Sequence, residues 1–397
     1  MSATTWWREQ RARRLHDDGV RMSGAEDWVR AEIALRTAAG IREGLHGPRH
    51  HDTLASRLWR ADALVGLGRA DEAVAELSAC IEDGGRASAD VSQMVLEARF
   101  LRCRVLRKGP LWRDPRVEED ARAVATALAG RFDEFHLDAA DRLGSVLGRL
   151  GLYAEAVAAV DGPIDGFADR NAADEPLLLR SRVNRGGELA YVGRFEEALE
   201  EWRGVMATIG TPRGPSQAYA LATARSGLVF ALCGLGRHAA AEGVARGALA
   251  EVAEGADLAS FRATLRINLA RSLNGQGRYE EAWEEVQAVR AALASDARKP
   301  SAEQSPLEVA AAFALLGLGR YGEAEAAAAE AVRCCREQTG AAHHRALEAG
   351  HAHAAALVAQ GRPEAAGLLA ANLAAWRAGF GDAHPGTRAA VALAGSG

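Results

Sequence analysis

The chain has 397 residues, of which 48% are hydrophobic and 25% are charged. This composition is typical of a soluble folded protein and excludes an intrinsically disordered chain. The formal net charge of −5 is too small to indicate a nucleic-acid or membrane partner.

The start of the chain, MSATTWWREQ, lacks the apolar core of a signal peptide, and no window approaches 18 uninterrupted apolar residues. The five cysteines are scattered and have no metal-ligand spacing, which is typical of buried thiols in a reducing compartment. These features predict a cytoplasmic protein without a membrane partner.

Residues 1–45 predict a helical hairpin that precedes the rest of the array. Its two segments read TTWWREQRARRLHDDG and GAEDWVRAEIALRTA. We interpret residues 1–45 as an atypical first repeat or an N-terminal cap.

A tandem repeat follows over residues 46–383. A glycine opens each of seven similar segments such as GRYEEA and GRYGEA, and from residue 151 onward these glycines recur every 41 to 43 residues. An alanine lies five positions after each glycine, and a small residue lies seven positions before six of them. Spacings that are kept along the chain in this way identify an internal repeat. The glycines are Gly68, Gly151, Gly193, Gly236, Gly277, Gly319 and Gly361.

Each repeat predicts two antiparallel helices joined at the glycine. Glycine supplies the left-handed conformation that ends the first helix, and acidic residues suit the positive end of the second. In such an array each hairpin is expected to contact only its neighbours, so the chain should behave as a spring.

One repeat, at about residues 88–130, is degenerate. Around Gly109, Arg102 and Asp114 replace the expected small residues, and KGPLWRDPRVEED implies a longer turn with a helix restarting at Pro115. We expect the weakest joint of the array here. Since no Pro- or Ser-rich linker divides the chain, we expect one continuous solenoid, closed by a capping helix and tail over residues 384–397.

The segment INLARSLNGQGRYEEAWEEV (267–286) has a small residue, a glycine, an aromatic residue and an alanine at these offsets. This pattern resembles the tetratricopeptide repeat. The 42-residue period is similar to the kinesin light chain subtype and its bacterial relatives. The connectors GPRHHDT (47–53), GAAHHRA (340–346) and GDAHPGT (381–387) resemble the Gly-x-x-His-Pro-x-Thr connector of that subtype. The resemblance implies an all-α, right-handed solenoid of about eight to nine helical hairpins.

The resemblance also implies a concave groove lined by the first helix of each hairpin. Such a groove suits a peptide segment or a partner protein, because amide side chains can bind backbone groups and aromatic rings can anchor apolar side chains. The candidate binding residues are Asp138, Asp141, Arg180, Asn184, Thr223, Phe230, Asn268, Arg271, Phe313, Glu348 and His351.

One specialised groove of that family is not expected. Its clamp for a C-terminal carboxylate needs basic residues and asparagines in three successive repeats. Arg180 and Asn184 match its first part, but Gly227 replaces the next asparagine, and Thr264 and Asn268 replace the final basic pair.

Motifs for catalysis are missing from the sequence. It contains no GxxxxGK[ST], HExxH, CxxC or GxSxG, so we predict no enzymatic activity and no cofactor. His344, Glu348 and His351 share one helical face and could ligate zinc. The alternative is that the connector histidines cap turns, and on that interpretation we predict no metal.

The basic stretch 99–116 contains six arginines and one lysine against one aspartate, with Trp112 among them. It is an alternative site for nucleic acid or an acidic protein segment. The other interpretation, a solvated helix face with arginine stems over apolar surface, makes nucleic acid an unexpected partner.

The sequence therefore predicts a non-catalytic protein–protein interaction scaffold. A peptide-responsive regulator of a transcription factor or signalling partner is the alternative, although no DNA-binding module or separate effector bundle is visible. An enzyme or metal-binding protein on the same scaffold is a minor alternative, based on the face of His344, Glu348 and His351.

Overall fold

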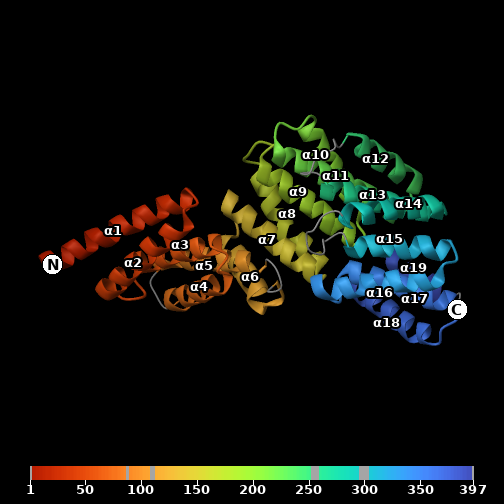
Figure 1. The fold of residues 1–397 in the computed structure, drawn as a ribbon. Coiled ribbons are helices and arrows are strands. Elements are labelled where there is room, and N and C mark those ends of the chain that lie inside the picture. The colour runs from red at the N-terminus through yellow and green to blue at the C-terminus, as the bar shows by residue number, and fades with distance from the viewer. Residues whose placement is uncertain (1, 86–88, 108–111, 252–258, 295–303, 396–397) are drawn as a thin grey trace. The chain divides into compact units, whose positions relative to one another are not determined.

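A computed structural model describes residues 2–85, 89–107, 112–251, 259–294 and 304–395. Over these ranges the chain contains nineteen α-helices and no strand (Figure 1). No helix in the described ranges is both long enough and apolar enough to cross a membrane. The chain divides into two compact units, unit 1 (Met1–Arg131) and unit 2 (Phe132–Gly397).

Unit 1 contains three consecutive helical hairpins. Its helices are α1 (Ala3–Gly24), α2 (Trp28–His46), α3 (His51–Gly66), α4 (Ala70–Gly84), α5 (Ala89–Leu106) and α6 (Pro115–Leu128). Leu35, Leu64 and Leu77 are fully buried between these helices. The structure thus has a helical hairpin over the first 45 residues and two further hairpins behind it.

Unit 2 contains six hairpins and a final single helix. Its helices are α7 (Glu134–Leu150), α8 (Tyr153–Ala168), α9 (Pro176–Tyr191), α10 (Phe195–Ile209), α11 (Pro215–Gly234), α12 (His238–Glu251), α13 (Ala259–Gly275), α14 (Tyr279–Ala294), α15 (Gln304–Gly317), α16 (Tyr321–Gln338), α17 (His344–Ala359), α18 (Glu364–Phe380) and α19 (Pro385–Ala394). Nine hairpins plus α19 confirm the predicted all-α solenoid.

The turn glycines adopt the conformation that the repeat predicts. All seven have positive φ, from 66° at Gly361 to 91° at Gly193. The small residues seven positions earlier allow close helix packing: a Cβ on Gly144 would lie 2.9 Å from Val160 Cγ1, and one on Gly186 would overlap the Trp202 ring. Both features of the repeat register are confirmed.

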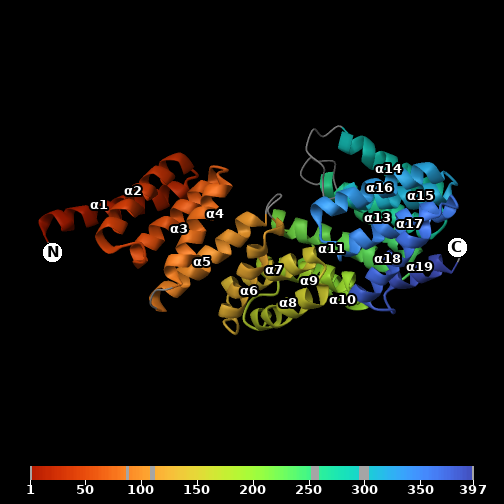
Figure 2. The same cartoon turned by 90° about the horizontal axis from the view of Figure 1, so that it is seen from below.

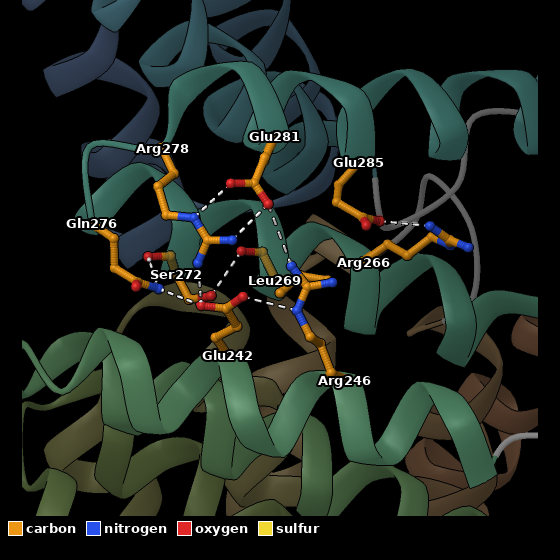
Figure 3. Close-up of polar contacts among 9 residues, drawn as sticks. All are labelled: Glu242, Arg246, Arg266, Leu269, Ser272, Gln276, Arg278, Glu281 and Glu285. Carbon is orange, nitrogen blue, oxygen red and sulfur yellow. Dashed lines mark hydrogen bonds and ion pairs between the residues drawn. The ribbon is translucent and has the colours of Figure 1, made fainter.

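Arginines beside these turns organise ion pairs between hairpins, as Figure 3 shows for α12, α13 and α14. Arg278 follows the turn glycine and donates two hydrogen bonds of 2.6 Å to Glu281, three residues later. It also donates to Glu242 on α12 at 2.6 Å, and Gln276 donates to the same carboxylate at 2.9 Å. The acidic residues after the glycine therefore bind the turn arginine as well as lying at a helix N-terminus.

The basic stretch 99–116 contributes to the internal ion pairs of unit 1. Asp120 is fully buried and accepts hydrogen bonds from Arg99 at 2.8 Å and from Arg102 at 2.7 and 2.9 Å. Arg104 pairs with Asp62 at 2.8 Å. These arginines are paired within unit 1, which supports the structural interpretation of the stretch.

Helix α6 begins at Pro115, the predicted restart, and Asp114 caps it by accepting a 3.0 Å hydrogen bond from the Arg116 backbone. The expected weak turn at Gly109 lies outside the described residues. The sequence predicted one continuous solenoid. The described residues form two compact units, and the boundary between these units directly follows the degenerate repeat.

Unit 2 closes on itself, which the repeat pattern does not predict. Its last helices lie beside its first ones in both views (Figures 1 and 2). The facing ends of α7 and α8 contact the ends of α16 and α17. Arg149 Nε, at the end of α7, donates to the carbonyl of Gln338, the last residue of α16, at 3.0 Å. The backbone N–H of His344, the first residue of α17, donates to the hydroxyl of Tyr153, the first residue of α8, at 3.1 Å. The expectation that each hairpin contacts only its neighbours is therefore wrong for unit 2. We call these contacts the closing seam.

One turn glycine, Gly151, packs directly against backbone atoms across the closing seam. A Cβ on Gly151 would lie 2.7 Å from the carbonyl carbon of Ala342, whereas Gly319, with φ of 73°, has nothing within 4 Å of such a Cβ. We expect Gly319→Ala to cost about 1–2 kcal/mol because of left-handed strain alone. Gly151→Ala should cost clearly more, because the methyl group also separates the seam.

Urea unfolding followed by hydrogen exchange of peptides from residues 145–155 and 338–348 measures this difference. Equal losses for Gly151→Ala and Gly319→Ala would contradict the closing seam.

Candidate functional site

The interior of unit 2 contains two adjoining cavities, both partly open to solvent. Cavity 1, of about 700 Å³, lies among α10–α15 and α17–α19, and cavity 2, of about 570 Å³, lies among α7, α9–α11, α13, α15 and α17. Both volumes are in the range of small-ligand sites. Three residues line both cavities and mark their boundary: Phe230, Arg271 and His344.

The boundary is a compact aromatic and ionic contact. The Phe230 ring packs edge-on against His344 with centroids 5.5 Å apart, and the Arg271 guanidinium lies 5.3 Å from the Phe230 centroid. Arg271 donates two hydrogen bonds to Glu348 of α17, one of them 3.0 Å from Nη2 to Oε2. Facing helices α13 and α17 are therefore joined across the interior by a partly buried ion pair.

Uncharged histidines line the closing seam. His343 and His384 cap α17 and α19: each Nδ1 accepts a 3.1 Å hydrogen bond, from the Arg345 and Gly386 backbones respectively. This confirms the prediction that connector imidazoles cap turns. Burial, followed by the nearby charges of Arg345 and Arg149, lowers the pKa of His343 to about 3. A cap nitrogen that accepts a hydrogen bond cannot also carry a proton.

Acid should therefore open the seam. A histidine with a lowered native pKa is protonated first in the unfolded chain, so unfolding becomes easier as the pH falls below about 6.5. From pH 7 to pH 5 the free energy of unfolding should fall by about 2 kcal/mol for a histidine whose pKa is lowered as strongly as that of His343. Hydrogen exchange of residues 340–350 at several pH values measures it.

His343→Asn is the matched variant, because asparagine also caps helices but does not titrate. It should reduce the acid sensitivity of residues 340–350, whereas His50→Asn, at the equivalent exposed cap of α3, should leave it unchanged. Identical pH profiles for the wild type and His343→Asn would rule out this role.

One carboxyl oxygen in the wall of cavity 2 has no hydrogen-bond partner among the described residues. Glu188, on α9, lines the cavity, and its Oε2 is buried without a hydrogen-bond partner among the described residues. Burial, reinforced by the nearby charge of Asp141, raises the pKa of Glu188 to about 8. Glu188 is therefore mostly protonated at neutral pH.

Glu188 should make unit 2 less stable in alkali. Its native pKa is raised, so its cost is absent below about pH 4.5 and grows as the pH rises to about 8. The free energy of unfolding of Glu188→Gln should therefore exceed that of the wild type by about 1–3 kcal/mol at pH 9 and by little at pH 4.

Urea unfolding at both pH values provides the measurement, with the exposed Glu200→Gln as the control. A gain for Glu188→Gln that does not depend on pH would show that ionisation of Glu188 is not its cause.

The structure brings eight of the eleven predicted binding residues to the two cavities. Cavity 1 is lined by Phe230, Arg271, Phe313, Glu348 and His351, and cavity 2 by Asn184, Thr223, Phe230, Asn268 and Arg271. Asp138, Asp141 and Arg180 line neither cavity.

Some of these side chains are engaged within the protein. Asp141 is buried and accepts hydrogen bonds from Asn184 at 2.8 Å and Arg180 at 3.2 Å, while burial raises its pKa. Asn268 donates to the hydroxyl and the carbonyl of Ser226 at 3.0 and 3.2 Å. These interactions hold neighbouring inner helices together.

The proposed zinc ligands lie near one another but serve other contacts. His344 Nε2 is 3.8 Å from Glu348, whose two oxygens bind Arg271, and the His351 ring packs on Phe313 with centroids 6.1 Å apart. Within the described ranges, no three His, Cys, Asp or Glu side chains are grouped to hold a metal ion.

Three functional candidates were missed from sequence: Tyr191, Glu188 and Arg345. Tyr191 lies at the seam, where its hydroxyl accepts a 3.5 Å hydrogen bond from Arg345. Tyr191 and Glu188 lie two and five positions before a turn glycine, so the repeat register could have placed them on an inner helix. No local signal identifies Arg345, because its environment is created by closure.

No protein-family model and no curated protein matches the chain. Solved structures do match. The chain is similar to the apo quorum sensor NprR from B. thuringiensis (13% identity, TM-score 0.58, 89% of this chain and 98% of that one). It is also similar to a Rap protein complexed with Competence and Sporulation Factor (12%, 0.52, 98% and 97%).

A tetratricopeptide repeat protein from Parabacteroides merdae matches over 76% of this chain and 99% of its own, with 12% identity and a TM-score of 0.50. The chain has the tetratricopeptide-repeat fold. The repeat hairpins thus provide the inner helices of both cavities, while residues at the closing seam, such as Tyr191 and Arg345, line cavity 2.

Proposed function

We propose that this tetratricopeptide-repeat protein is a non-catalytic binding protein that holds a short peptide segment in cavities 1 and 2. The supporting observation is that two cavities of ligand size adjoin inside unit 2 at Phe230, Arg271 and His344. A ligand that occupies both would bury groups against this shared boundary.

The linings suit a peptide in both chemistry and arrangement. Cavity 1 is lined by aromatic rings such as Phe313, Tyr279 and Trp376, which can receive apolar side chains. Asn274 lines the same cavity, and its buried Oδ1 has no hydrogen-bond partner among the described residues. Glu188, which is mostly protonated at neutral pH, contributes an uncharged group to the wall on the other side, in cavity 2.

Closure favours a short segment over a long extended one. The seam joins α7 and α8 to the connector before α17, so the interior is bounded where an open solenoid would leave its trough continuous. A peptide of a few residues fits such an interior without opening the seam.

Peptide-responsive regulation is a second candidate, supported by the surface of unit 1. Trp7 and Val29 are 62% and 59% exposed, and large exposed apolar side chains are typical of surfaces that bind partners. NprR is described as a quorum sensor and the Rap structure as a complex with a named factor, but similarity at 12–13% identity extends to the fold alone.

Filling cavity 2 tests the proposal without disturbing the fold. Gly187 lies within α9 and lines cavity 2, and a Cβ added to it would meet nothing within 4 Å, so Gly187→Leu should fit as a helix former and occupy the cavity. Gly247→Leu, at an exposed position of α12 with equal space, is the matched control.

The assay is equilibrium dialysis of a synthetic pool of N-acetylated hexapeptides, with retained members identified by mass spectrometry. We expect the wild type and Gly247→Leu to retain the same peptides and Gly187→Leu to bind them at least about tenfold more weakly, a change of about 1.4 kcal/mol. Retention of no peptide, or equal retention by Gly187→Leu, would refute peptide binding in these cavities.

A further inference from the structure

Arg345, on the wall of cavity 2, has no carboxylate partner among the described residues. It is the second residue of α17, and its side chain is partly buried. Its one side-chain hydrogen bond within the described ranges is the 3.5 Å contact from Nη2 to the Tyr191 hydroxyl. Its other charged or titratable neighbours include Tyr153, Cys335, His343 and His344, and none of these carries a negative charge at neutral pH.

The other arginine that lines the cavities is arranged differently. Arg271 has its counterion in Glu348, to which it donates two hydrogen bonds. A guanidinium cannot lose its proton in a protein, and a charge held away from water without a partner is costly. Arg345 therefore carries a positive charge that the described part of the chain leaves uncompensated.

Glu188 does not compensate this charge. It lines the same cavity, but its carboxyl group lies beyond the 4.0 Å ion-pair distance from Arg345 and has no hydrogen-bond partner for Oε2. A carboxyl group can avoid the cost of burial by keeping its proton, whereas an arginine cannot. The cavity is consequently short of one negative charge beside Arg345.

We propose that Arg345 binds a carboxylate group of the ligand in cavity 2, an inference that rests on the peptide-binding function proposed above. A guanidinium presents its donors as a planar fork that matches a carboxylate. One uncompensated positive charge calls for one negative charge, so a monoanionic carboxylate fits better than a phosphate dianion.

The rest of the cavity 2 wall suits an apolar group next to that carboxylate. The Tyr219 and Phe261 rings pack edge-to-face with centroids 4.9 Å apart, and Trp202 also lines the cavity. The ligand class is thus a peptide whose carboxylate lies beside an aromatic or large apolar side chain.

This arrangement differs from the clamp considered from sequence, which distributes basic and amide side chains over three successive inner helices. Arg345 acts from the start of one helix at the closing seam. Its position beside Tyr191, which belongs to a hairpin four repeats earlier, exists only in the closed unit.

The test uses N-acetyl-L-phenylalanine and its amide as probes with the full-length protein. Titrations followed by the NMR signals of arginine side chains measure both affinities and report on Arg345 directly. We expect the acid to bind the wild type at least about tenfold more tightly than the amide, because the acid alone forms a charge-assisted pair.

Arg345→Met should reduce this acid preference to less than about threefold, and the matched control Arg203→Met, at an exposed position on α10, should keep it. If Arg345→Met does not fold, as judged by circular dichroism, Arg345→Lys replaces it. Arg345→Lys should retain a weaker acid preference, because lysine keeps the charge but loses the fork. Equal binding of acid and amide to the wild type, binding of neither, or an unchanged preference in these variants would overturn the proposal.

Two hexapeptide pools identify the source of the carboxylate. One pool has free C-terminal acids and no Asp or Glu, and the other has C-terminal amides with a single Glu. Preference for the first assigns the chain terminus to Arg345, and preference for the second assigns an acidic side chain.

The same pools separate the two proposals. Retention of neutral amides without an acid preference would refute the role of Arg345 and leave peptide binding intact. Binding of N-acetyl-L-phenylalanine through Arg345 without retention of any hexapeptide would refute peptide binding alone.

Discussion

The contacts that join the start of unit 2 to its end determine what its interior can do. Two of them, from Arg149 to the Gln338 carbonyl and from the His344 backbone to the Tyr153 hydroxyl, link residues 189 and 191 positions apart. A tetratricopeptide solenoid without such contacts is a chain of neighbour interactions that can extend and twist. In unit 2 the same hairpins line two partly open cavities, and the closing seam limits how far the hairpins can separate.

The seam combines aromatic packing with polar groups that are kept uncharged. Tyr153, Tyr191 and His343 have ring centroids 5.2 to 6.1 Å apart, and His343 uses its unprotonated nitrogen as a helix cap. Burial favours the neutral forms of these histidines and of Glu188 alike. The seam histidines and Glu188 in cavity 2 are therefore all uncharged only over a limited pH range around neutrality.

The sequence predicts the parts of this structure that depend on local spacing. The turn glycines have positive φ, and the small residues leave room for the side chains of Trp202 and Val160. The positions predicted to face inward, counted from the turn glycines, include Phe230 and Arg271, which line the cavities. Closure could not be predicted in this way, because it results from small rotations summed over several repeats. The identity of each internal partner also depends on it, and for this reason the pairing of Arg271 with Glu348 was not foreseen.

The two arginines inside unit 2 show why the burial of a charge must be judged together with its partner. Arg271 joins facing helices and is neutralised by Glu348, so its first effect is on the arrangement of the walls. Within the described ranges Arg345 has only a hydroxyl partner, so unit 2 holds it at an energetic cost that a ligand carboxylate would relieve. Because a ligand that binds only the folded state stabilises it, occupancy of cavity 2 would also strengthen the seam beside Arg345. If the proposed carboxylate binds Arg345, ligand binding and closure of unit 2 are coupled through one side chain.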